Sequence, residues 1–200
     1  MAKQRRLSRK EKRRVERDQD HLMGILNTKF SMRKIRPITA TQSDLFESYE
    51  EGYNLAAIGT AGTGKTMCAT YLALNDVLQK GEYEKVVIIR SAVQTREQGF
   101  MPGTQAQKEA VFEAPYNDIV NDLFERKDAY NLMKSKGMIE FKTSSFVRGL
   151  TFDNAIIIVD ECQSMTYHEL DSIITRVGES SKIVFCGDTK QDDLATSKNR

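Results

Sequence analysis

The chain has 200 residues, of which 40% are hydrophobic and 29% are charged, so it is long enough for one domain with a sizeable core. No apolar run reaches the ~18 residues that a membrane span needs, and the charged N-terminus lacks the apolar region of a secretory signal. Three cysteines without a C-x-x-C pair argue against a disulfide framework or a zinc site, so we expect a cytoplasmic protein with no membrane association.

Basic residues are concentrated at the N-terminus. Residues 1–17 contain nine lysines and arginines against Glu11 and Glu16, a local charge of +7, whereas the whole chain carries +2. We expect a disordered or nascent-helical arm over residues 1–20 that attracts phosphate backbones, followed by a single domain over residues 21–200. A solvated tail that only aids solubility is the alternative.

Apolar runs alternate with helical patterns along the rest of the chain. The runs are rich in Val and Ile without polar alternation, which is typical of a parallel sheet buried on both faces and predicts an α/β fold. Strands are expected at 54–59, 85–90, 138–143, 154–161 and 181–188. Helices are expected at 41–50 with Thr39 or Thr41 as the cap, at 65–80, at 104–134 with Pro115 as an interruption, and at 166–178 with Gly178 as the stop.

A phosphate-binding loop, here called the P-loop, lies between the first predicted strand and the next helix. It fits the pattern G-x-x-x-x-G-K-[ST] and consists of Gly59, Thr60, Ala61, Gly62, Thr63, Gly64, Lys65 and Thr66. Glycines let backbone N–H groups turn inward around a β-phosphate, and the following helix points its positive end at the anion. We expect Lys65 to reach the β- and γ-phosphates and Thr66 to offer its hydroxyl to Mg²⁺.

Acidic and polar residues follow two later strands. A P-loop requires an acidic site at another strand end, and after "AIIIV" we predict that Asp160 holds Mg²⁺ and that Glu161 polarises an attacking water. Asp188 and Gln191 follow the last strand and should emerge at the same carboxyl edge of the sheet. Gln191 is a candidate γ-phosphate sensor, although a turn built on Gly187 and Asp188 would also explain this segment.

Four segments, in this order and spacing, resemble the PhoH family of phosphate-starvation-type ATPases, most closely a short phage-type member. They are "GTAGTGKT", "IRSAVQTREQGFMPG", "IEFKTSSFVRGLTFDNAIIIVDECQS" and "GDTKQDDL", and the resemblance covers roughly residues 40–194. It implies a RecA-like P-loop core similar to that of superfamily-one helicases, with ATP and Mg²⁺ as cofactors. It also implies ATP hydrolysis and, less firmly, binding or remodelling of RNA or single-stranded nucleic acid. A homo-oligomeric ring such as a hexamer is implied by the family alone, as is the host cytoplasm if a phage encodes the chain.

The resemblance extends to residues outside the P-loop. Gln42 resembles the helicase glutamine whose amide reads adenine, and a solvent-facing glutamine is the alternative. Arg90 and Ser91 end the second strand, as in the helicase motif that touches a nucleic-acid backbone. Arg148 is a candidate contact for nucleic acid or for a neighbouring subunit's nucleotide, and a solvated loop arginine is equally compatible with its position.

The chain departs from the family pattern after "GDTKQ". In the family another strand with a basic segment follows, whereas this sequence stops at Arg200. We therefore expect the sheet to lack an edge strand and the arginine finger of that region. We also expect no second RecA-like domain, so translocation would need a ring of subunits or a partner.

Two other functions stay open. The P-loop, the chain length and "DECQ" also resemble class II thymidine kinases, although their four-cysteine zinc site has no counterpart in a chain without C-x-x-C. The second alternative is a non-hydrolysing switch that holds ATP and binds RNA. Glu161 argues against such a switch, and the shortened C-terminus argues for it.

Overall fold

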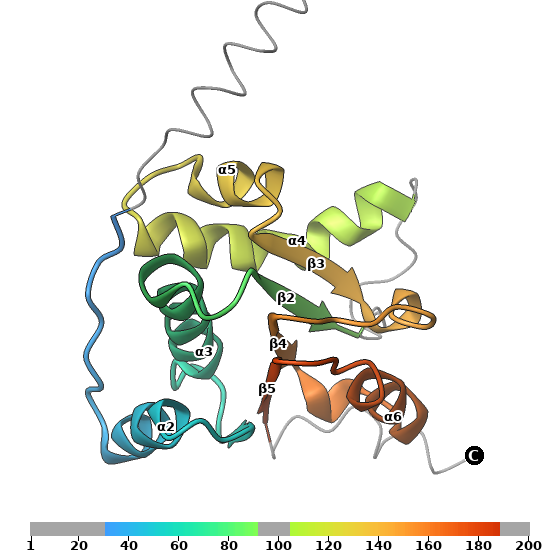
Figure 1. The fold of residues 1–200 in the computed structure, drawn as a ribbon, viewed down its shortest axis with the longest axis horizontal. Coiled ribbons are helices and arrows are strands. Elements are labelled where there is room, and N and C mark those ends of the chain that lie inside the picture. Colours follow the sequence, from blue (N-terminus) through green and yellow to red (C-terminus); the bar gives the residue numbers. More distant parts are fainter. Residues whose placement is uncertain (1–30, 92–104, 189–200) are drawn as a thin grey trace, which may run out of the picture. The chain divides into compact units, whose positions relative to one another are not determined.

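The computed structural model describes residues 31–91 and 105–188 (Figure 1). Residues 32–91 and 105–188 belong to one unit, and the contacts of the protein are described within it. The predicted basic arm, residues 1–20, and the candidate sensor Gln191 lie outside the described residues. The predicted division into an arm and a single domain, and the predicted lack of an edge strand, therefore stay predictions. In the described ranges, no helix is long and apolar enough to cross a membrane.

The described residues form one parallel sheet. Its strands are β1 (Leu55–Ile58), β2 (Lys85–Arg90), β3 (Ile139–Thr143), β4 (Ala155–Asp160) and β5 (Lys182–Gly187). Their order is β1-β5-β4-β2-β3, and every pairing is parallel. Each strand lies within a range predicted from the sequence, so the predicted α/β fold is confirmed.

The central strands are buried on both faces. All six side chains of β4 and the four inner side chains of β2 are buried. Figure 1 shows α3 (Lys65–Asn75) and α6 (Tyr167–Ile174) on opposite sides of β4 and β5. Ile173 of α6 packs into an apolar cluster with Ile157 and Val159 of β4. This two-sided burial explains why the strands lack polar alternation, and the parallel arrangement gathers their carboxyl ends at one edge.

Further helices flank the sheet. They are α2 (Ala40–Glu50), α4 (Gln105–Leu123) and α5 (Ala129–Ser135), with a π-helical turn at Asp76–Lys80 after α3 and 3₁₀ turns at Ser144–Phe146 and Cys162–Ser164. Thr39 caps α2, as predicted, because its hydroxyl accepts a hydrogen bond of 3.2 Å from the Gln42 N–H. Thr166 caps α6 in a capping box that Glu169 closes.

The predicted interruption at Pro115 is wrong. Pro115 lies inside α4, which continues to Leu123. A proline removes the N–H that would bond to the carbonyl four residues earlier, here that of Val111. Val111, at 49% exposure, and Pro115 are both exposed, so the missing hydrogen bond lies on the solvent-facing side of α4, where the helix tolerates the proline.

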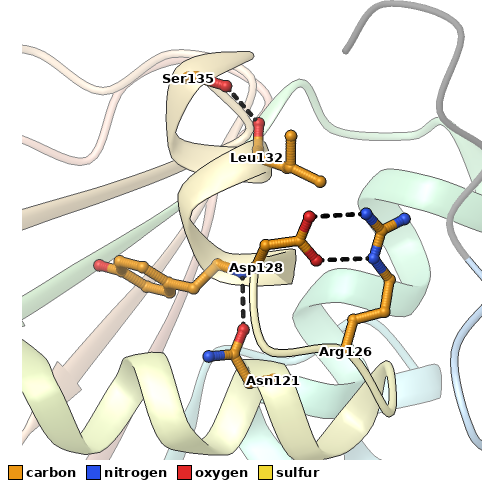
Figure 2. Close-up of polar contacts among 6 residues, drawn as sticks. Asn121, Arg126, Asp128, Leu132 and Ser135 are labelled. Atoms are coloured by element: carbon orange, nitrogen blue, oxygen red, sulfur yellow. Dashed lines mark hydrogen bonds and ion pairs between the residues drawn. The ribbon is translucent and has the colours of Figure 1, made fainter. Parts of the chain in front are cut away.

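The helical segment is broken instead at residues 124–128, in the turn that Figure 2 shows. The Arg126 guanidinium donates two hydrogen bonds of 2.8 Å to the Asp128 carboxylate. The Asn121 side-chain oxygen accepts a 3.1 Å hydrogen bond from the Tyr130 N–H. Ser135 then bonds back to the Leu132 carbonyl at the end of α5. These local polar contacts reverse the chain between α4 and α5.

The predicted role of Gly178 as the stop of a helix is also wrong. The helix α6 ends at Ile174, and the chain beyond it runs beside Phe152, whose carbonyl accepts a 2.9 Å hydrogen bond from the Gly178 N–H. A Cβ at position 178 would lie 1.9 Å from Asp153 Oδ1 and 2.8 Å from the Phe152 carbonyl oxygen. Glycine is needed here for close approach of two chain segments, not for helix termination.

Lys182 fixes α2 against the sheet. Its buried ammonium donates a 2.9 Å hydrogen bond to the Tyr49 carbonyl and lies 3.9 Å from the centroid of the Tyr49 ring. Burial lowers the pKa of Lys182, and the nearby Asp76 carboxylate opposes this effect. With its C-terminal end held in this way, α2 places Gln42 beside the P-loop.

Candidate active site

The P-loop joins β1 to α3 and leaves the first turn of α3 open. Gly62 and Gly64 adopt the left-handed conformation, with φ of +76° and +81°, which glycine tolerates without strain. Gly64 is the N-cap of α3, and no side chain in the described part of the chain caps this end. The first turn of α3 also carries no acidic residue. Its backbone N–H groups and positive helix end are therefore suited to an anion such as phosphate.

Lys65 lies across the P-loop. Its ammonium donates hydrogen bonds of 2.8 Å to the carbonyls of both Gly59 and Thr60. Thr63 closes the same turn by donating from its hydroxyl to the Thr60 carbonyl at 2.8 Å. The Lys65 ammonium therefore lies beside the P-loop residues that would surround a bound phosphate.

A cavity of about 300 Å³ opens beside the P-loop at the carboxyl edge of the sheet. Its lining comes from the P-loop, α3, α4 and the ends of β4 and β5: Ala61, Gly62, Gly64, Lys65, Thr66, Met67, Ile119, Asp160, Glu161, Cys186, Gly187 and Asp188. The structure therefore brings together most of the predicted P-loop residues, the two predicted acids and Asp188.

Asp160 and Thr66 form the candidate metal site. The Thr66 hydroxyl donates a 2.8 Å hydrogen bond to Asp160 Oδ1, and Asp160 is only 6% exposed. Burial raises the pKa of Asp160, while hydrogen bonds from Tyr116 and Thr66 lower it, so that the net shift is upward.

The donor set of this site suits Mg²⁺, which prefers hard oxygen ligands and is commonly held by one or two carboxylates together with substrate phosphates. No group of three or more His, Cys, Asp or Glu side chains that could hold a metal occurs in the described ranges, so a dedicated protein cage is not built there. Thr66 and Asp160 are the residues that would hold Mg²⁺.

Glu161 follows β4 in a left-handed conformation, with φ of +52°. Its carboxylate accepts a 2.6 Å hydrogen bond from the side-chain amide of Gln163. The oxygen of the same amide accepts a 2.9 Å hydrogen bond from the Asp188 N–H. Gln163 therefore connects the candidate base to the end of β5. Sequence reasoning did not select Gln163, although its place two residues after Glu161 was a usable signal.

A tyrosine from α4 is the other residue that sequence reasoning missed. The Tyr116 hydroxyl donates a 2.8 Å hydrogen bond to Asp160 Oδ2. Burial raises the pKa of Tyr116 well above its ordinary value, and the neighbouring Asp160 charge raises it further, so the hydroxyl stays a donor. A tyrosine within a helical pattern carries no sequence signal for such a contact.

Gln42 contacts the P-loop directly. Its amide nitrogen donates a 3.0 Å hydrogen bond to the Thr63 carbonyl, and its amide oxygen accepts a 2.9 Å hydrogen bond from the Ile38 N–H. A Cβ at Gly64 would lie 3.3 Å from the Gln42 amide nitrogen. The prediction that Gln42 reads adenine stays a prediction; the residue is half-buried and lies next to the P-loop.

The three predicted nucleic-acid contacts differ in exposure: Arg90 is half-buried, Ser91 is buried and Arg148 is exposed. Arg90 pairs in register with Asp160 on the neighbouring strand, and its guanidinium lies 5.8 Å from the centroid of the Phe112 ring. Ser91 is 4% exposed, and its hydroxyl points to Glu169 at 3.5 Å. Arg148 is exposed in the loop after the 3₁₀ turn at Ser144–Phe146. Their roles toward nucleic acid stay predictions.

Comparisons with known proteins agree with the fold. The family described as "PhoH-like protein" matches residues 34–200. Among curated proteins, the chain is 34% identical over 163 residues to a PhoH-like protein of Mycobacterium leprae, covering 81% of this chain and 46% of that protein. It is 32% identical over 167 residues to the PhoH protein of Escherichia coli, and the match covers 81% of this chain and 47% of that protein. The chain thus spans about half the length of the curated relatives that it matches.

A solved structure with a similar fold is the SWI2/SNF2 ATPase core of Sulfolobus solfataricus in complex with double-stranded DNA. The TM-score is 0.50 with 12% sequence identity, over 84% of this chain and 36% of that one. At this identity the likeness concerns the fold alone, and it agrees with the predicted RecA-like fold.

Proposed function

The chain belongs to the PhoH family, and we propose that its cavity binds ATP with Mg²⁺ and hydrolyses the nucleotide to ADP and phosphate. The observation that carries this proposal is the placement of Lys65, Thr66, Asp160 and Glu161 around one cavity at the carboxyl edge of the sheet. Hydrolysis of a nucleoside triphosphate needs a phosphate cradle, metal ligands and a group that orients water, and residues suited to each of these tasks line the cavity.

Each residue has a separate task in the proposed reaction. The N–H groups of the P-loop and the Lys65 ammonium would bind the phosphates, and Thr66 and Asp160, which already share a hydrogen bond, would hold the metal. Mg²⁺, when bound, would neutralise charge on the phosphate oxygens. Gln163 engages Oε2 of Glu161, and we infer that Oε1 accepts the proton of the attacking water.

Product analysis tests this function against the alternatives. Incubation with radiolabelled ATP, Mg²⁺ and thymidine should give ADP and phosphate at a rate that does not depend on thymidine. Thymidine monophosphate as the product would establish the kinase alternative. Tight ATP binding without any product would establish the non-hydrolysing switch.

We also propose that Gln42 selects adenine by pairing its amide with the base. To do so, the amide must exchange its bonds to Ile38 and Thr63 for bonds to the nucleotide. Replacing Gln42 with alanine should weaken ATP binding about 10-fold, the worth of one or two hydrogen bonds, while GTP binding changes little. The measurement is the affinity for both nucleotides, with Ser43→Ala as the control because Ser43 is an exposed neighbour on α2. Equal losses for ATP and GTP would show that Gln42 only supports the P-loop.

We propose, in addition, that ATP turnover is coupled to binding of single-stranded RNA. The support is the family resemblance and the local charge of +7 in residues 1–17. A cluster of this density attracts phosphate backbones and releases their counterions, which makes binding dependent on salt.

Deleting residues 1–17 should therefore weaken binding of single-stranded RNA and flatten its salt dependence. The slope of log affinity against log salt concentration should become less steep by ~0.7 for each phosphate that the arm neutralises. Binding of ATP between Gly59 and Thr66 should not change. The measurement is RNA affinity at several salt concentrations. A variant with the same seventeen residues in scrambled order is the control, and it should behave like the natural chain because composition sets the charge. Superimposable curves for the deleted and natural chains would reduce the arm to a solubility tail.

A further inference from the structure

The Asp160 carboxylate is fixed at both of its oxygens. Oδ1 accepts from the Thr66 hydroxyl and Oδ2 accepts from the Tyr116 hydroxyl, each at 2.8 Å. The three side chains come from β4, α3 and α4. Asp160 is 6% exposed and Tyr116 is 1% exposed, so solvent can replace neither bond without rearrangement. Thr66 and Asp160 both line the cavity, whereas Tyr116 is not among the residues that line it.

The Tyr116 ring is held in place by the sheet. It packs against Phe141 of β3, with 5.7 Å between the ring centroids and an angle of 34° between the planes. Phe112 lies four residues earlier on the same face of α4, and the Arg90 guanidinium lies over its ring. Arg90 in turn pairs with Asp160 in the sheet register. α4 therefore packs two aromatic side chains, Phe112 and Tyr116, near the strand ends around Asp160. Of these two, Tyr116 is the one that donates a hydrogen bond to the carboxylate.

From this geometry we propose that Tyr116 is a positioning residue for the Mg²⁺ site of the proposed ATPase. By binding Oδ2, Tyr116 prevents the Asp160 carboxylate from rotating and keeps Oδ1 directed at Thr66 and the cavity. The inference rests on the proposed function. Its physical basis is general: groups that hydrogen-bond to a metal ligand orient that ligand, and a buried carboxylate oxygen without its donor has nothing to compensate for its missing hydration.

The test is Tyr116→Phe, which removes one oxygen atom and keeps the ring. The readout is the affinity of the protein for a fluorescent ADP analogue, in EDTA and across a Mg²⁺ titration. In EDTA the affinity should stay within about twofold of that of the natural chain, because the P-loop contacts are intact. The Mg²⁺ concentration needed for tight binding should rise about 10-fold, the usual loss for a residue that orients a metal ligand.

A matched control is present in the chain. Tyr130 is also buried, and its hydroxyl donates a 2.6 Å hydrogen bond to a carboxylate, that of Glu113, away from the cavity. Tyr130→Phe deletes the same atom and the same kind of bond. Because neither Tyr130 nor Glu113 lines the cavity, the substitution should leave the Mg²⁺ dependence unchanged. An equal Mg²⁺ shift in both variants, or no shift in Tyr116→Phe, would overturn the proposal.

A double substitution tests whether Tyr116 acts through Asp160. In an Asp160→Asn background, adding Tyr116→Phe should change the Mg²⁺ dependence less than twofold, because the carboxylate that Tyr116 orients is already gone. Additive effects would contradict the inference. If the natural chain itself bound the analogue without any Mg²⁺ dependence, the proposed function would fail, which distinguishes that failure from a failure of Tyr116 alone.

Discussion

Replacing Lys65 with alanine is expected to reduce the affinity for ATP·Mg²⁺ by about 100-fold, because the variant loses charge-assisted hydrogen bonds to the β- and γ-phosphates. The ammonium already lies at the P-loop, 2.8 Å from two of its carbonyl oxygens, so no large movement is needed for it to meet a phosphate. The measurement is equilibrium titration with a fluorescent ATP analogue, accompanied by thermal denaturation to verify that the variant is folded.

Lys142→Ala is the control for this experiment. Lys142 lies on β3, outside the cavity lining, and pairs with Glu140 at 3.6 Å. The substitution removes the same charge from a partly buried side chain, and nucleotide affinity should not change. If Lys65→Ala bound the analogue as tightly as the natural chain, the P-loop would not be the phosphate site.

Replacing Glu161 with glutamine should preserve ATP binding and lower the turnover rate by on the order of 10²-fold or more. Glutamine keeps the size of the side chain, and its oxygen can still accept the hydrogen bond from Gln163, so the link to the end of β5 survives. The substitution removes the negative charge and, with it, the capacity to take a proton from water. Turnover under saturating ATP and affinity for the fluorescent analogue are the two quantities to compare.

Glu47→Gln provides the same chemical change at an exposed position on α2 and should leave both quantities unaltered. Equal losses of binding and turnover in Glu161→Gln would indicate a structural carboxylate rather than a base. The left-handed backbone at Glu161 is unchanged by the substitution, because both side chains place the same demand on φ.

Local patterns predicted most of the fold. Apolar runs rich in Val and Ile predicted the buried strands β2 and β4, and the P-loop and the acids after β4 lie at strand ends that the sequence marks directly. The errors arose where distant residues decide the outcome. Pro115 is tolerated because α4 is exposed to solvent around Val111. Gly178 is needed because Phe152 and Asp153 lie against it. Neither circumstance is visible in the neighbouring sequence.

The same reason explains which site residues could be predicted. Asp160 and Thr66 belong to recognisable motifs, so their meeting across 94 positions was foreseeable. Tyr116 belongs to no motif, and only the packing of α4 against β3 brings its hydroxyl to Asp160, 44 positions away. Gln163 is close to Glu161 in sequence, but its orientation depends on the Asp188 N–H at the end of another strand.

Phosphate release from ATP by the natural chain tests the central claim most directly. The assay follows radiolabelled phosphate over time at saturating ATP, in Mg²⁺ and in EDTA, with Glu161→Gln measured in parallel. The account predicts release that requires Mg²⁺, saturates with ATP, and exceeds the rate of Glu161→Gln by on the order of 10²-fold. Release that continues in EDTA, or that is equally fast in Glu161→Gln, would contradict the assignment of this cavity as an ATPase site.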